Sequence, residues 1–110
     1  MDNSFNRHKN TKILLNSVIA NVTSEYVAFP SVKRTLEAIV IGTGAVGATV
    51  KVYGCNTPRN TNGILLATIT LSGTTSDQGG SELTVEWPYM YAVLSGISGT
   101  GAAVTCSVAV

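Results

Sequence analysis

The chain has 110 residues, the length of a single domain, and an unusually small share of charge. Only 12% of its residues are charged, against about 25% in an average protein, and the formal net charge is +1. Ser, Thr, Asn and Gly together supply 43 residues. Because Thr favours strands while Gly and Asn favour turns, this composition favours β-structure with many tight turns over a helical bundle. A net charge near zero gives no global basic field for nucleic acid, so we expect no nucleic-acid partner.

The positive charge is concentrated at the start of the chain. The first twelve residues contain four basic side chains, one of them a histidine, and a single acidic side chain. The rest of the chain carries a small net negative charge. We therefore expect residues 1–12 to form a basic, polar N-terminal arm and residues 13–110 to form one β-sandwich domain. The arm is either a frayed terminus or an apolar and basic hook that orders against an acidic neighbour. The hook would consist of Phe5, Arg7, Lys9 and Lys12.

Two cysteines are too few for a disulfide scaffold. Cys55 and Cys106 do not have the spacing of a metal site, and the one histidine, His8, lies in the arm. We expect free thiols, no metal and no cofactor. No stretch approaches the roughly 18 apolar residues that a membrane span needs, so we expect no membrane partner.

Strand-like segments follow one another along the chain after the arm. Turn-rich stretches at 56–63, 72–81 and 95–101 separate the later segments. No segment has a sustained helical period with caps, although the first strand-like segment is also compatible with a short helix. The pattern predicts an all-β fold, a jelly-roll or β-sandwich of seven to eight antiparallel strands. The expected strands are 13–22, 25–29, 34–41, 48–55, 64–71, 82–87, 89–94 and 102–110.

Alternation within these strands predicts which side chains form the core. Val50 and its alternate neighbours should point inward, as should the apolar residues at alternate positions of 82–87 and 102–110. In the segment 34–41 the apolar run is continuous, so either Val40 or the pair Ile39 and Ile41 is expected in the core. The inward set comprises Ala48, Val50, Val52, Leu83, Val85, Trp87, Val104, Cys106, Val108 and Val110.

The stretch Gly42–Gly47 fits the G-x-G-x-x-G pattern of a dinucleotide site. Such a site also needs a helix that starts at the last glycine and an acid about 20 residues later. Gly47 instead precedes a β-branched run, and residues 60–70 contain no Asp or Glu. Gly-Thr-Gly-Ala recurs at Gly99–Ala102, again between strand-like runs. We interpret both copies as turns and expect Gly42–Gly47 to be the tip of a hairpin.

No arrangement of side chains in the sequence predicts catalysis, and we expect no enzyme. A Ser-His-Asp site would depend on His8 in the arm, and Glu82 and Glu86 share the outward face of one strand rather than facing each other across a cleft. Trp87 lies at an alternate position with Leu83 and Val85, so we expect its ring to pack in the core. Tyr89 and Tyr91 are more open and are candidates for an interface.

From Leu36 onward, the order of features resembles the capsid decoration proteins (staple or cement proteins) of short-tailed phages, the epsilon-fifteen-like group among them. The matching features are the strand exit Val52-Tyr53-Gly54, the segment 69–74, Trp87-Pro88-Tyr89 and the closing segment 99–104. The resemblance is one of pattern, and no individual site residues follow from it. It implies a jelly-roll on the outer surface of the virion that bridges major capsid protein subunits and pairs with itself, as a homodimer rather than a trimer. The alternative is a carbohydrate- or receptor-binding β-sandwich module of a tail fibre, which would need aromatic side chains on an exposed face.

Overall fold

The computed structural model describes residues 11–28, 34–83 and 87–109, and every regular element in these ranges is a strand. The expectation of an antiparallel all-β sandwich is confirmed. Among the described residues, no helix has the length and apolar character required to cross a membrane. The strands are β1 (Lys12–Val18), β2 (Val22–Thr23), β3 (Val27–Ala28), β4 (Arg34–Cys55), β5 (Ile64–Leu83) and β6 (Tyr89–Ala109).

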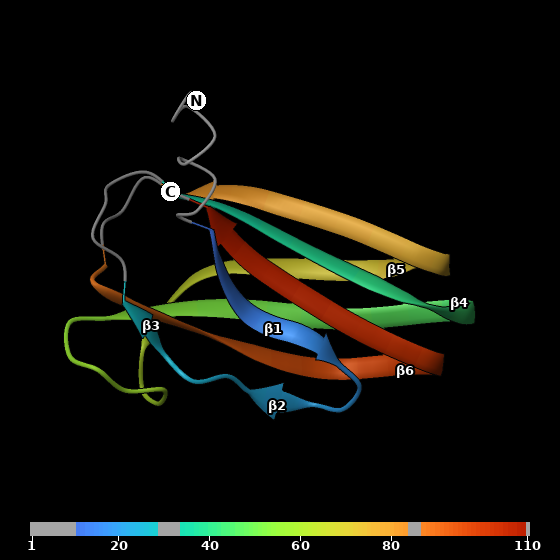
Figure 1. Ribbon diagram of the computed structural model, residues 1–110, viewed down its shortest axis with the longest axis horizontal. Helices are drawn as coiled ribbons and strands as arrows, with labels where there is room; N and C mark the ends of the chain where they lie inside the picture. Colours follow the sequence, from blue (N-terminus) through green and yellow to red (C-terminus); the bar gives the residue numbers. More distant parts are fainter. Residues whose placement is uncertain (1–10, 29–33, 84–86, 110) are drawn as a thin grey trace, which may run out of the picture.

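Three long strands, β4, β5 and β6, build most of the molecule (Figure 1). The sheet order is β1-β6-β4-β5, with β2 and β3 also paired to β6. Each long strand bends near its middle and passes from one layer into the other. The first half of β4 therefore pairs with the last half of β6, from Thr35 opposite Ala109, and its second half pairs with the start of β6, to Cys55 opposite Tyr89. The sandwich is a single sheet folded over on itself.

This arrangement corrects the hairpin that we expected at Gly42–Gly47. The two halves of β4 do not pair with each other: Ala38 pairs with Cys106, and Val50 pairs with Leu94. β5 and β6 bend at the same level as β4 and supply its ladder partners on both sides of the bend, so the glycines turn the strand into the next layer instead of reversing it. For the same reason, the expected loops at 72–81 and 95–101 are parts of β5 and β6, and the strands are fewer and longer than predicted.

The three bends form one rim, which we call the fold-over edge. Each strand bends through residues with positive φ: Gly44 at 71° in β4, Thr75 at 65° in β5, and Gly99 and Gly101 at 112° and 65° in β6. L-residues with a side chain rarely adopt this conformation, which explains Gly44, Gly99 and Gly101. Gly42 has no positive φ, but a Cβ atom there would lie 2.8 Å from Val46 Cγ1. The two copies are also neighbours in the fold, because Thr43 is opposite Thr100 in the register.

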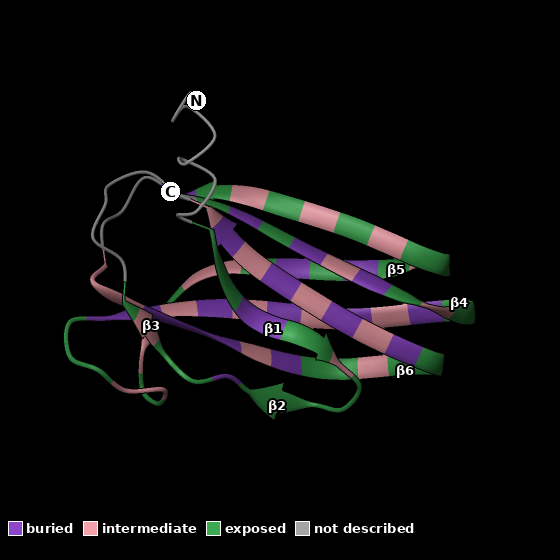
Figure 2. Ribbon diagram, in the orientation of Figure 1, coloured by how far each residue is buried: buried purple, intermediate pink, exposed green. Residues whose placement is uncertain are grey.

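Buried residues alternate with more exposed ones along the long strands (Figure 2). The buried apolar side chains form one core cluster. The alternation keeps the same parity on both sides of each bend, because a sheet that folds over keeps one face inside. Val40 is fully buried, whereas Ile41 is 53% exposed. Of the two alternatives for this segment, the one that places Val40 in the core is confirmed. Trp87 packs partly buried against the core, as expected. The buried even-numbered residues with apolar side chains are Leu36, Ala38, Val40, Val46, Ala48, Val50 and Val52 in β4, and Met90, Ala92, Leu94, Ala102, Val104, Cys106 and Val108 in β6.

Candidate functional site

The residues predicted as interface candidates do not form one site. Phe5, Arg7 and Lys9 lie outside the described residues. Lys12, which we had placed at the end of the arm, is exposed and is the first residue of β1. The structure therefore gives no geometry for the hook.

The two predicted interface tyrosines differ from each other. Tyr89 is half-buried and meets Tyr26 edge-to-face, with ring centroids 5.6 Å apart. Tyr91 is only 3% exposed, so the expectation that it is open is wrong. Its parity is outward, but the loop after β4 covers it, and its hydroxyl accepts a hydrogen bond from the main-chain N–H of Gly63 at 3.0 Å.

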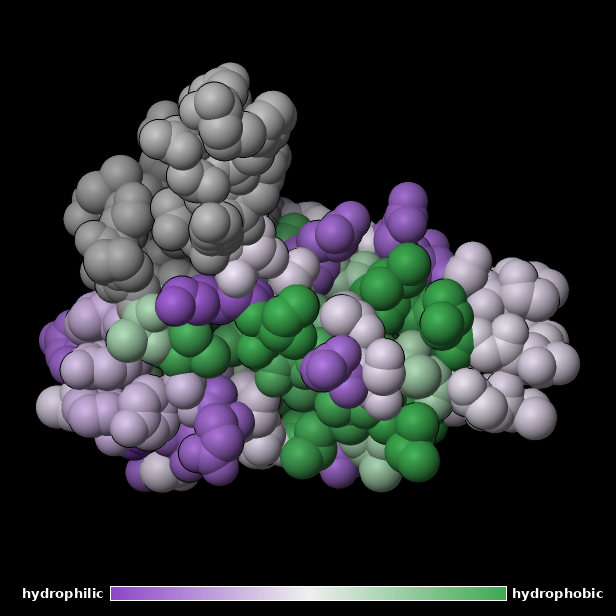
Figure 3. Space-filling view, in the orientation of Figure 1, coloured by the Kyte–Doolittle hydropathy of each residue, from purple (hydrophilic) through white to green (hydrophobic). Residues whose placement is uncertain are grey.

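One outer face of the sandwich carries several exposed apolar side chains, which Figure 3 shows over β1, the first half of β4 and the β1–β2 connection. Ile13, Ile19 and Ile41 are 52%, 75% and 53% exposed. Ile41 is opposite Ala103 and Ile13 is opposite Ser107, so both lie on the outer side of the same layer. We call this surface the apolar face and define it by Ile13, Ile19, Ile39, Ile41 and Ala103.

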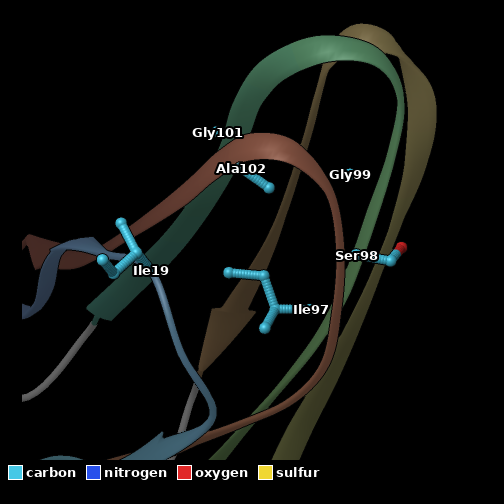
Figure 4. A pocket seen from close by; sticks show the side chains of 6 residues that line it. All are labelled: Ile19, Ile97, Ser98, Gly99, Gly101 and Ala102. Atoms are coloured by element: carbon cyan, nitrogen blue, oxygen red, sulfur yellow. The ribbon is translucent and has the colours of Figure 1, made fainter.

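A shallow hollow of about 270 Å³ lies where the apolar face meets the fold-over edge (Figure 4). Ile19, Ile97 and Ala102 border it with apolar side chains, and Ser98, Gly99 and Gly101 complete its wall. The N–H of Ile97 donates to the side-chain oxygen of Asn21 at 3.2 Å, which joins the β1–β2 connection to β6. The hollow can receive a small apolar side chain of a partner.

A second pocket, of about 240 Å³, lies on the outer face of the opposite layer. Its floor includes Tyr53 and Tyr91, whose rings stack with centroids 5.2 Å apart and an interplanar angle of 11°. Thr23 and Val93 form one side, and loop residues 60–63 form the other. We call it the tyrosine pocket.

The loop beside the tyrosine pocket, residues 56–63, is held by a network of hydrogen bonds. The Arg59 guanidinium donates to the carbonyls of Thr61 and Asn62, at 3.0 and 3.3 Å, and to the hydroxyl of Thr57. The side-chain amide of Asn60 donates to the carbonyl of Ser24 at 3.3 Å, which ties the loop to the segment between β2 and β3. The loop therefore has a defined shape before any ligand arrives.

The described residues contain no group of three His, Cys, Asp or Glu side chains that could hold a metal ion. Cys55 and Cys106 are both free, as expected, and both are buried. Burial raises the pKa of the Cys106 thiol from 9.0 to about 12, so this thiol stays protonated and inert at neutral pH. The Gly42–Gly47 stretch leads into strand and not into a helix, so it lacks the helix N-terminus of a phosphate site.

Sequence reasoning missed both surfaces. Ile41 was a candidate for the core, and Tyr53 was noted only as part of a strand exit. If residues 34–55 had been taken as one continuous strand with its even-numbered residues in the core, the odd-numbered Ile41 would have been predicted to be exposed. The pairing of Tyr53 with Tyr91 joins two strands that are neighbours in the sheet but far apart in the sequence, so no local sequence pattern indicates it.

No protein-family model matches the chain, and no curated protein matches it in sequence. Solved structures do match in fold. The SPBc2 prophage-derived protein YomS matches with a TM-score of 0.53 at 11% identity, over 89% of this chain and 88% of that chain. The carbohydrate-binding module CBM6cm-2 from Cellvibrio mixtus lichenase 5A, in complex with cellotriose, matches with a TM-score of 0.53 at 10% identity, over 92% and 87%.

A protein of Bacillus endospore appendages, which form disulfide-linked pili, matches with a TM-score of 0.51 at 12% identity, over 89% and 80% of the two chains. At such identities these similarities establish the β-sandwich fold alone, because one fold hosts many unrelated functions. Function must be argued from the surfaces of this chain.

Proposed function

We propose that this protein is a structural virion protein that binds the outside of a phage capsid, bridges major capsid protein subunits and stabilises the shell. The observation that carries the proposal is the apolar face. Monomeric proteins rarely leave large contiguous apolar patches in water, and such patches commonly mark interaction sites. Ile13, Ile19 and Ile41 are each more than half exposed, and no described element of this chain covers them.

The contact energy of this face suits a protein that acts in many copies. Complete burial of an isoleucine stabilises by about 1.5–3 kcal/mol, so covering the exposed half of one side chain contributes roughly 1 kcal/mol. Three such side chains give a weak single contact of about 3 kcal/mol. A protein that bridges two subunits adds a second contact at high effective concentration, and this multivalency makes weak contacts sufficient.

The chain composition supports a role in assembly. With 12% charged residues, few charges need to be desolvated when a partner covers the surface. The fold of the prophage-derived protein YomS is compatible with a phage origin, but it carries no argument about the capsid.

We further propose that the protein pairs with itself as a homodimer through the free edge of β5. Among the described strands, β5 pairs only with β4, so its other edge presents unpaired main-chain groups. Residues 64–71 of this edge contain no charge, and Ile64 and Leu65 are 55% and 50% exposed. An antiparallel copy of the same segment meets no like charges there. Sedimentation equilibrium would detect the dimer, and a monomer at millimolar concentration would rule it out.

Binding to undecorated shells of the cognate major capsid protein tests the main proposal. The expected result is saturable co-sedimentation at a fixed ratio of the two proteins. Deletion of residues 1–10 leaves β1 whole and tests the arm separately. Weaker binding of the truncated chain would support the hook, and unchanged binding would refute it.

A further inference from the structure

The tyrosine pocket has a lining that selects for an uncharged ligand. Its walls present aromatic rings, amides and hydroxyls, and none of the Lys, Arg, Asp or Glu side chains that the structure describes lines it. A phosphate or carboxylate ligand is normally held by Arg or Lys, and a divalent cation by carboxylates. The lining therefore fits a neutral molecule that has both hydroxyl groups and an apolar C–H face.

The loop that forms one wall is pre-organised. The Arg59 guanidinium uses the main-chain carbonyls of Thr61 and Asn62, so these bonds shape the loop without occupying the side chains of either residue. The N–H of Gly63 is tied to the Tyr91 hydroxyl at 3.0 Å. A ligand that enters such a loop loses little affinity to ordering it.

The closeness of the loop to the stacked rings fixes the width of the pocket. A Cβ atom on Gly63 would lie 3.0 Å from the Tyr53 Cβ and 3.0 Å from the Tyr91 ring, so a larger residue would have to push the loop or the rings apart by a few tenths of an ångström. The resulting space of about 240 Å³ is below the roughly 300–1,000 Å³ of drug-sized sites. It suits one ring of about a dozen heavy atoms.

From this geometry we propose that the tyrosine pocket binds a single neutral sugar ring. The exposed part of Tyr53 contacts the C–H face of the ring, while the side chains of Thr61 and Asn62 hydrogen-bond its hydroxyls. No covalent step is involved.

The pocket lies on the opposite side of the sandwich from the apolar face. Tyr53 belongs to the second half of β4, while Ile41 and its neighbours belong to the first half, in the other layer. A chain docked through its apolar face would present the pocket outward, where a polysaccharide could reach it. The sugar site does not depend on the proposed capsid role, since the pocket is complete within one chain.

Two variants remove the polar contacts while they keep the backbone. Asn62 has φ 56°, a conformation that glycine adopts readily, so Asn62→Gly deletes the amide without straining the loop. Thr61→Val replaces the hydroxyl with a methyl group of similar size. Asn56→Ala, at an exposed position of the same loop outside the pocket, is the matched control.

Ligand-observed NMR and amide shift mapping on the full chain provide the test. The probes are methyl α-D-glucopyranoside, methyl β-D-galactopyranoside and N-acetyl-D-glucosamine, with glucuronate as a charged comparison. A ligand of this size is expected to bind in the millimolar range and to shift the amide signal of Gly63. Each pocket variant should weaken binding about fivefold to tenfold, the effect of one or two lost hydrogen bonds, while Asn56→Ala should bind as the wild type does.

Three outcomes would overturn the proposal: no shift with any neutral sugar at high millimolar concentration, equal binding of glucuronate, or unchanged affinity in the Asn62→Gly, Thr61→Val double variant. Binding to shells is measured separately, so the sugar site and the capsid role can each fail without the other.

Discussion

Replacing Gly44 by valine tests the explanation of the fold-over edge. Gly44 has φ 71°, and a Cβ atom built there has no heavy atom within 4 Å. Any loss of stability in Gly44→Val would therefore come from the backbone and not from a clash. A residue other than glycine in the left-handed region costs roughly 1–2 kcal/mol, and a β-branched residue lies at the upper end.

Part of this cost is offset in the unfolded state. Valine restricts the unfolded chain more than glycine does, which stabilises the fold by about 0.4–1 kcal/mol. The net expectation is a loss of about 1–1.5 kcal/mol, or a fall in Tm of roughly 5 °C for a domain of this size. Asparagine tolerates the left-handed region better, so Gly44→Asn should lose less than half as much.

Urea denaturation followed by circular dichroism measures the difference. Thr43→Val is the control, since Thr43 is exposed and has no positive φ, and it should change stability by less than about 0.5 kcal/mol. If Gly44→Val were as stable as the wild type, the bend would not depend on glycine and the account of the fold-over edge would be refuted.

Three further predictions follow from the packing, the surface and the buried thiol. Gly54→Ala should lose about 1–3 kcal/mol in urea denaturation, because its Cβ would lie 2.5 Å from the Trp87 Cγ; an unchanged midpoint would show that Trp87 moves freely. Ile41→Asp should bind shells several-fold more weakly at unchanged Tm, while Ser95→Asp, at an exposed position on the other outer face, should bind normally; equal binding by both would exclude the apolar face. Above pH 9 the unfolded Cys106 thiol ionises while the folded thiol keeps its proton until about pH 12, so unfolding becomes easier as pH rises through this range. Cys106→Ala should lose less stability than the wild type between pH 8 and 10.5. An identical pH dependence of the two proteins would contradict the raised pKa of Cys106.

Local patterns in the sequence predicted the all-β class and most of the core, but not the number or length of the strands. Alternation is a property of neighbouring residues, so Val50, Val104 and Leu83 could be assigned inward without knowledge of the topology. The sequence also shows that apolar residues occupy even-numbered positions both before and after Gly42–Gly47. Glycines, however, are typical of a hairpin turn and of a bend within one strand alike. Only the neighbouring strands decide between the two, since β5 and β6 supply ladder partners on both sides of the bend.

The surfaces depended on long-range pairing and could not be predicted in the same way. The tyrosine pocket requires Tyr53 to pair with Tyr91 and the loop at Gly63 to close over them. Both contacts join segments that are distant in sequence. The apolar face likewise combines β1 with β4 across β6, so no single segment of the sequence shows it.

The thermal stability of the shell tests the central claim most directly. Undecorated shells of the cognate major capsid protein are melted alone, with the wild-type chain, and with Ile41→Asp. A protein that bridges capsid subunits is expected to raise the melting temperature of the shell in proportion to the bound chain until the sites are filled, because it binds the assembled state, and Ile41→Asp should raise it less. A melting temperature that does not change at saturating wild-type protein would contradict the proposed function.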